Sequence, residues 1–219
     1  MVKLKKRKLN PYKIAKILIV LLFLIAAPFV LRNIFRSEDK VFINVVDSLE
    51  LYSYELREDD TEYQKELFNE LKRIINEEEI DEEEYAKYLG KLFITDFYTM
   101  DTKVNNQDIG GVKFVHSDFQ DYFIEYAKEE IYIHVESRLG RARTQTLPII
   151  SNVTLNNMEV ADEFVEDSIF TLYFDIEYEN YDEIEQELPE SAMVLISYED
   201  SKLVIIDFQL KYQEDLEEQ

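Results

Sequence analysis

The chain has 219 residues, of which 47 are acidic and 24 are basic, and it contains no cysteine. The missing cysteines exclude disulfides and thiol chemistry, and the formal net charge of −23 repels nucleic acid, so no nucleic-acid partner is expected. Only four glycines and four prolines are present, which argues against a long flexible linker.

The first predicted element is an apolar segment over residues 14–31. Residues 17–31 form an uninterrupted apolar run of 15, and the whole segment spans 18 residues. That length is close to what an α-helix needs to cross a bilayer core of roughly 30 Å, and the long side chain of Lys16 can reach the interface. The side chains chosen as the membrane anchor are Ile17, Leu18, Leu21, Leu22, Phe23, Leu24 and Phe29.

Charge predicts the orientation of this transmembrane helix. Residues 1–16 contain seven basic side chains and no acidic one, and a basic flank favours the cytoplasmic side of a membrane. Residues 32–219 hold all 47 acidic residues and 17 basic ones, a formal charge of −30, and are expected outside the cytoplasmic membrane. The predicted regions are a basic cytoplasmic tail at 1–13, the transmembrane helix at 14–31, a juxtamembrane linker at 32–40, an extracytoplasmic domain at 41–214 and an acidic tail at 215–219.

A cleaved secretory signal is the competing interpretation of the same segment, because a basic start followed by an apolar core fits both. Ala26 and Ala27 are small enough for a cleavage site, but Pro28 would be the first residue after the cut. Phe35, two residues before Ser37, is too large for a second site of this kind. These residues favour an uncleaved anchor that stays in contact with membrane lipid.

Apolar residues recur at helical spacing in four segments before residue 140. This spacing predicts helices over residues 41–56, 62–77, 81–100 and 118–138. Thr61, Asp81 and Ser117 are the predicted N-caps, and Gly140 is the predicted end of the last helix. The expected buried face of that last helix consists of Phe119, Tyr122, Phe123, Tyr126, Ala127 and Ile131.

Residues 101–117 lack any periodicity and predict a long loop, which in a compact domain is often functional. Gly110 and Gly111, half of the glycines in the chain, stand side by side here. One interpretation is a tight turn between two helices. The other is a partner-binding loop, whose candidate residues are Gly110, Gly111, Val112, Phe114 and His116.

After residue 140 the apolar period changes from about 3.6 to 2, which predicts strands. The expected strands cover residues 147–160, 165–180, 193–198 and 203–212, with a hairpin connection at 199–202. Phe170, Leu172, Phe174 and Ile176 alternate with more polar residues and should face the core. The predicted fold class is therefore α+β: an N-terminal transmembrane helix, then three to four helices packed on a four-stranded antiparallel sheet.

No residue pattern indicates a reaction. With 47 carboxylates, no particular acid–base pair stands out, and His116 and His134 lack partners at metal-ligand spacing. Phosphate-loop and nucleophile-elbow motifs are missing as well. We therefore predict no catalytic residue, no metal and no cofactor. The basic cluster of Arg138, Arg141 and Arg143 is expected to neutralise nearby carboxylates and the end of the preceding helix.

The order of anchor, helices and four antiparallel strands resembles the nuclear-transport-factor-like cone fold. Within it, the chain is similar to membrane-anchored scaffold subunits of type IV secretion and conjugation machines. Enzymes of this fold use polar groups inside the cone, whereas the inward strand positions here, from Phe170 to Ile176, are apolar. The resemblance thus implies assembly rather than catalysis.

Three hypotheses for function follow. The favoured one is a single-pass membrane-anchored interaction or scaffold protein of the bacterial cell envelope. Its expected partner is an envelope protein, and a homo-oligomer is compatible with this hypothesis. The second is a small-ligand binder or enzyme that uses a cone-shaped cavity. The third is a secreted protein released by signal cleavage.

Overall fold

The computed structural model describes residues 43–139, 143–161, 168–179 and 188–211. All of them belong to the second of two compact units, Met1–Lys40 and Val41–Gln219. The predicted tail, anchor and linker at 1–40 and the acidic tail at 215–219 lie outside these residues. Within the described ranges, no helix combines the length and the apolar character that a bilayer crossing requires.

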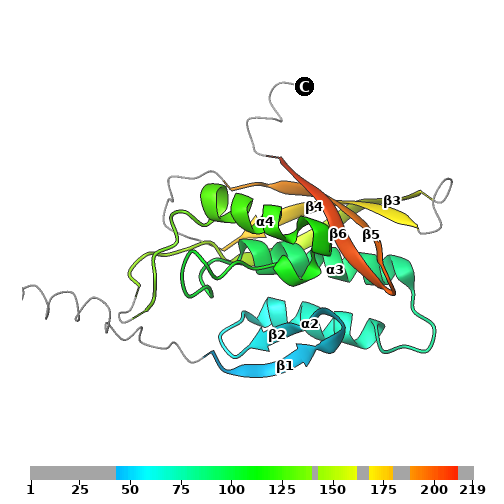
Figure 1. Cartoon of the computed structure of the whole chain (residues 1–219), viewed down its shortest axis with the longest axis horizontal. Coiled ribbons are helices and arrows are strands. Elements are labelled where there is room, and N and C mark those ends of the chain that lie inside the picture. The colour runs from blue at the N-terminus through cyan, green and yellow to red at the C-terminus, as the bar shows by residue number, and fades with distance from the viewer. Residues whose placement is uncertain (1–42, 140–142, 162–167, 180–187, 212–219) are drawn as a thin grey trace, which may run out of the picture. The chain divides into compact units, whose positions relative to one another are not determined.

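Four strands form one antiparallel sheet in the order β3-β4-β5-β6, as the alternating sequence pattern predicts. Their bounds are Ile150–Ala161 for β3, Ile169–Tyr178 for β4, Ser191–Glu199 for β5 and Lys202–Lys211 for β6 (Figure 1). Phe170, Leu172, Phe174 and Ile176 are buried, which confirms their predicted orientation. The hairpin between β5 and β6 is tighter than predicted, because Glu199 and Lys202 still pair across it.

Two helices form where the periodicity predicts them, each with a side-chain cap. Helix α2 covers Glu62–Ile74, and Thr61 forms a capping box with Gln64. Helix α3 covers Glu82–Tyr98, and the Asp81 carboxylate accepts hydrogen bonds from the amides of Glu83 and Glu84. Helix α3 contacts all four strands of the sheet, whereas α2 packs against α3. The mixed α+β architecture is therefore confirmed.

The predicted helix over residues 41–56 is wrong. The segment forms β1 (Val45–Leu49), a 3-10 turn at Glu50–Tyr52 and β2 (Tyr54–Arg57), which pair as a two-stranded antiparallel sheet. The chain reverses direction at Ser53, which adopts a left-handed conformation with φ of 51°. β-branched valines in β1 and the alternating burial of Tyr54 and Leu56 in β2 favour strands over the helical spacing.

The last predicted helix is shorter than the expected 118–138. A 3-10 turn at Ser117–Phe119 leads into α4 (Gln120–Tyr126) and a π-helical turn at Ala127–Ile131. The helix ends there because the fully buried Tyr132 turns inward, where its hydroxyl donates to the Phe97 carbonyl at 2.5 Å. His134 therefore lies after the helix and not within it, and Gly140 falls outside the described residues.

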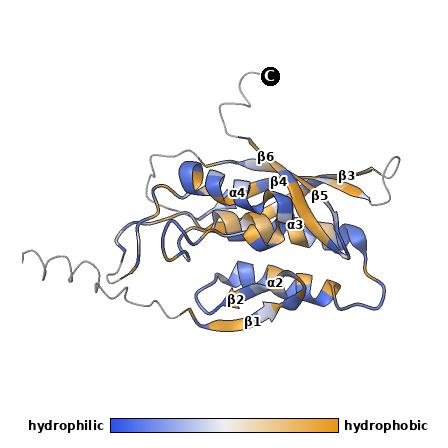
Figure 2. Ribbon diagram, in the orientation of Figure 1, coloured by the Kyte–Doolittle hydropathy of each residue, from blue (hydrophilic) through white to orange (hydrophobic). Residues whose placement is uncertain are grey.

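The space between α3 and the sheet is filled by large side chains. Phe93 and Phe97 of α3 pack against Phe208 of β6, with ring centroids 5.7 and 6.0 Å apart. Gly90 of α3 lies so close to the ring of Phe174 that an added Cβ would be 2.8 Å from the Phe174 Cζ atom. Figure 2 shows the hydrophobic residues of α3 and β6 that contribute to this core.

Candidate functional site

One side of the predicted partner-binding loop packs into the hydrophobic core. Phe114 is fully buried, and its ring centroid lies 5.3 Å from that of Tyr52 and 4.8 Å from that of Tyr54. Gly110 and Gly111 are also buried, Val112 is half-buried, and His116 lies at the loop end. The structure thus keeps the glycines and Phe114 together on the inner side of the loop, where a partner cannot reach them in this conformation.

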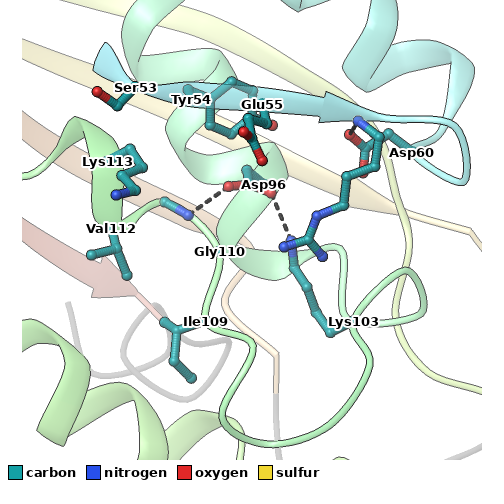
Figure 3. Close-up of a pocket in the computed structure, with 12 residues that line it drawn as sticks. Ser53, Tyr54, Glu55, Asp60, Asp96, Lys103, Ile109, Gly110, Val112 and Lys113 are labelled. Atoms are coloured by element: carbon teal, nitrogen blue, oxygen red, sulfur yellow. Dashed lines mark hydrogen bonds and ion pairs between the residues drawn. The ribbon is translucent and has the colours of Figure 1, made fainter. Parts of the chain in front are cut away.

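Asp96 of α3 lies against both glycines and binds the amide of Gly111. Its carboxylate accepts a hydrogen bond from the Gly111 amide at 2.7 Å and one from Lys103 Nζ at 2.6 Å (Figure 3). Gly111 needs to be glycine, since its φ is 76° and an added Cβ would press on the Phe93 ring. A Cβ on Gly110 would lie 2.0 Å from the Asp96 carbonyl oxygen. These contacts favour the tight-turn interpretation of the Gly-Gly pair.

A second ion pair ties the same loop to β2. The Arg57 guanidinium donates two hydrogen bonds to the Asp108 carboxylate, at 2.7 and 2.8 Å. Burial opposes ionisation of Asp108, but this hydrogen bonding and the nearby charge of Lys103 lower the pKa of Asp108 overall. Burial raises the pKa of Asp60, which accepts a hydrogen bond from the Arg57 amide. The bidentate Arg57–Asp108 pair therefore holds the middle of the loop against β2.

These groups surround a cavity of about 150 Å³ lined by residues of β2, α3 and the loop. That volume is small beside the roughly 300–1,000 Å³ of typical ligand pockets. Of the charged groups that line it, Asp96 and Lys103 pair with each other (Figure 3). Arg57 pairs with Asp108, which lies outside the lining, and the other charged groups of the lining are Glu55, Asp60 and Lys113. Among the described residues, no group of three His, Asp or Glu side chains could hold a metal ion. The cavity suits a few ordered water molecules, and its polar groups serve the loop.

The predicted basic cluster also stabilises the loop. Arg143 donates to the backbone carbonyls of Asp101 and Lys103, at 2.5 and 3.1 Å, and its side chain is almost fully buried. Arg138 pairs with Asp59 at 2.9 Å. Neutralisation of nearby carboxylates is thus confirmed for these two arginines, while Arg141 lies outside the described residues.

An apolar groove of about 310 Å³ lies between α4 and β6. Phe119 and Tyr122 form its helical wall and are 47% and 73% exposed. Ile206 and Phe208 of β6 form its floor, and the Phe208 ring packs against Phe123 at 5.7 Å. The groove is mainly apolar, and Asp207 is the charged residue among those that line it.

The floor of this groove belongs to an edge strand. β6 is last in the order β3-β4-β5-β6, so among the described strands only one of its sides pairs with another strand of the sheet. At its start, Ile205 forms a parallel bridge with Val115, and the His116 amide donates to the Ile205 carbonyl at 2.9 Å. The loop then turns away at Ser117, which leaves the remainder of the β6 edge beside the groove. An exposed strand edge next to apolar side chains is typical of peptide-binding surfaces.

His116 and Glu199 hold the loop at this turning point. The Nδ1 atom of His116 accepts the Asp118 amide at 3.2 Å, so His116 acts as the N-cap of the 3-10 turn. The Ser117 amide donates to Glu199 at 3.0 Å. The hydrogen bonding from Ser117 and the nearby Lys202 lower the pKa of Glu199. His116 therefore caps the 3-10 turn that leads into α4.

The assignment of Phe119 and Tyr122 to a buried helix face is wrong. Helix α4 lies beside an edge strand, so only Phe123, Ala127 and Ile131 reach the core, and Tyr126 is half-buried. The sequence signal that could have revealed the groove is the wide apolar face predicted for this helix. A helix of seven residues cannot bury a face of that width against one strand.

Comparisons of the chain with protein-family models, with curated proteins and with solved structures give no match. The resemblance to the cone fold and to secretion scaffolds therefore remains a prediction from element order.

Proposed function

We propose that the chain is a single-pass membrane-anchored interaction protein of a bacterial cell envelope, which binds a protein partner through the groove between α4 and β6. The observation that carries the proposal is the position of exposed Phe119 and Tyr122 beside the open edge of β6. Large apolar side chains that gather in a groove on a protein surface commonly mark a partner site. The apolar segment at 14–31 supports the anchored location.

The packing of the domain interior supports an interaction role over the cone-cavity alternative. Phe93, Phe97 and Phe174 occupy the space between α3 and the sheet, and all three are buried. In the polar cavity near Asp96, the charges of Arg57, Asp96 and Lys103 are engaged in ion pairs that hold the loop. A membrane tether would raise the local concentration of neighbouring envelope proteins, so a modest affinity in the groove would suffice.

The test is photocrosslinking in intact cells from the full chain, with a photoreactive side chain at Tyr122. Val160 on β3 is the matched control, since it is 41% exposed and lies on the opposite edge strand. The proposal expects a membrane or wall protein attached from position 122 and not from position 160. Uncrosslinked monomer from both positions, with the protein present in the membrane fraction, would overturn it.

A further inference from the structure

We infer that the groove binds an extended peptide with alternating apolar and basic residues, which adds a strand to the open edge of β6. This inference rests on the proposed function and names the chemistry of the partner. Its first support is the isolated Val115–Ile205 bridge, together with the hydrogen bond from the His116 amide to the Ile205 carbonyl, which shows that this edge of β6 accepts backbone pairing. An added peptide would occupy the edge beyond the point where the loop leaves it.

The groove selects for an extended occupant because its two walls offer different groups. The Phe208 amide already donates to the Asp207 carboxylate at 2.9 Å, so an added strand would pair with the other N–H and C=O groups on the edge of β6. A helix, whose backbone is already bonded, could not pair with them. Phe119, Tyr122 and Phe208 present apolar surface beside that edge. A strand places every second side chain on one face, so one set of residues would fill the groove while the other would face outward.

The charge around the groove indicates basic residues on the outward-facing side. Between residues 117 and 131 there are five acidic side chains and one basic side chain. Of these, Asp118, Asp121 and Glu125 are exposed and stand next to the wall residues Phe119, Tyr122 and Tyr126 in the sequence. Asp207 is the charged residue that lines the groove itself. Lysine or arginine in the peptide would be attracted to this rim.

The same charge argues against a second copy of the chain as the occupant. Residues 32–219 carry a formal charge of −30, so two copies brought face to face through an acidic rim would repel each other. Acidic segments of other proteins would be disfavoured for the same reason. The occupant with complementary charge is thus a basic, apolar segment of a different envelope protein.

The direct test uses two pools of synthetic ten-residue peptides and the full chain in detergent or nanodiscs. In one pool Val, Ile, Leu or Phe alternates with Lys or Arg, and in the other the same apolar residues alternate with Asp or Glu. Fluorescence anisotropy should detect binding of basic peptides that weakens as salt increases. No binding of the basic pool above that of the acidic pool would overturn the inference.

Backbone methylation of the best basic peptide tests strand addition separately from charge. Methylation of the amides on the edge that pairs with β6 should reduce affinity at least tenfold, while methylation of the alternate amides should change it less than threefold. Equal effects from both methylated peptides would contradict strand addition and indicate a helical or irregular occupant.

Protein variants locate the binding site. Tyr122→Ala should weaken binding of the basic peptide about tenfold, whereas the control Val160→Ala should leave it unchanged. Equal affinity of both variants would overturn the assignment to the groove. If position 122 crosslinks an envelope protein in cells but no basic peptide binds, the inference fails while the proposed function stands.

Discussion

Lys103 Nζ lies 2.6 Å from Asp96 Oδ1, and the two side chains are only 3% and 9% exposed. The pair joins α3 to the loop at 101–117. Removal of one partner would leave the other as an unpaired buried charge, which costs about 3–5 kcal/mol of folding free energy. Burial of the pair itself costs desolvation free energy, so replacement of both partners should cost less than the sum of the two single changes.

We therefore predict that Asp96→Asn and Lys103→Met each lower the free energy of unfolding by about 3 kcal/mol. The double variant should lose less than the sum of the two. The free energies of unfolding can be measured by thermal or chemical unfolding of the full chain in detergent, with near-UV circular dichroism as the signal. The exposed pair of Arg73 and Glu70 provides a control, and its removal should leave stability nearly unchanged. Strict additivity of the Asp96 and Lys103 effects would contradict the coupling.

The Arg57–Asp108 pair predicts a dependence of stability on pH. The pKa of Asp108 is lower in the folded chain, so ionised Asp108 stabilises the fold above its ordinary pKa of 3.8, and this contribution disappears as pH falls through the folded pKa. Asp108→Asn should therefore reduce stability at pH 6, with a difference from the wild type that shrinks below pH 4. A difference that stays constant from pH 6 to pH 3 would show that Asp108 acts through packing alone.

Gly90 is predicted to resist substitution although it lies inside a helix. Alanine would normally stabilise a helix interior by about 1 kcal/mol relative to glycine. Here the added Cβ would lie 2.8 Å from the buried ring of Phe174, and overpacking of this kind costs about 1–3 kcal/mol. Gly90→Ala should therefore lower the unfolding temperature, and the addition of Phe174→Leu should cost less in that background than in the wild type.

Neighbouring aromatic residues of α4 should differ sharply in their effect on stability. Tyr122 is exposed and Phe123 is buried. Phe123→Ala should cost about 3–5 kcal/mol, as for other buried aromatic residues, while Tyr122→Ala should change stability by less than about 0.5 kcal/mol. Equilibrium unfolding of both variants checks this, and a large loss for Tyr122→Ala would place that side chain in the core and not in a binding groove.

The predicted anchor can be tested by charge substitution. Leu21→Lys combined with Leu22→Lys places two charges near the centre of the segment at 14–31, at an insertion cost of roughly 3 kcal/mol each. We expect the variant to lose its resistance to extraction from membranes by alkaline carbonate. The control, Lys3→Ala with Lys5→Ala, alters only the tail and should remain in the membrane pellet. Extraction of the wild type under the same conditions would contradict an anchor.

The helices and strands that could be predicted from the sequence are those whose apolar residues recur with one clear period. Helices α2 and α3 show helical spacing and side-chain caps, and β4 alternates strictly, so each was located within a few residues. The segment at 41–56 fits both periods, and what decides it is the reversal at Ser53 and the pairing of β1 with β2. That pairing depends on tertiary contacts, which a local pattern does not contain.

The candidate site was harder to predict for a related reason. Asp96 looks like one more carboxylate among 47, and only the folded chain brings it to Lys103 and Gly111. Phe119 and Tyr122 follow the same spacing as core residues, and their exposure arises because α4 lies beside an edge strand. The spacing of apolar residues along the sequence does not indicate which side chains become neighbours, nor which strand lies at the edge of the sheet.

Arg143 also has a consequence for how the domain opens. Its guanidinium joins the segment just before β3 to the backbone of Asp101 and Lys103, 40 or more positions earlier in the chain. Since these hydrogen bonds must break together, the loop and the start of the sheet should open as one cooperative unit in native-state hydrogen exchange. A change in either segment would then alter the opening rate of both.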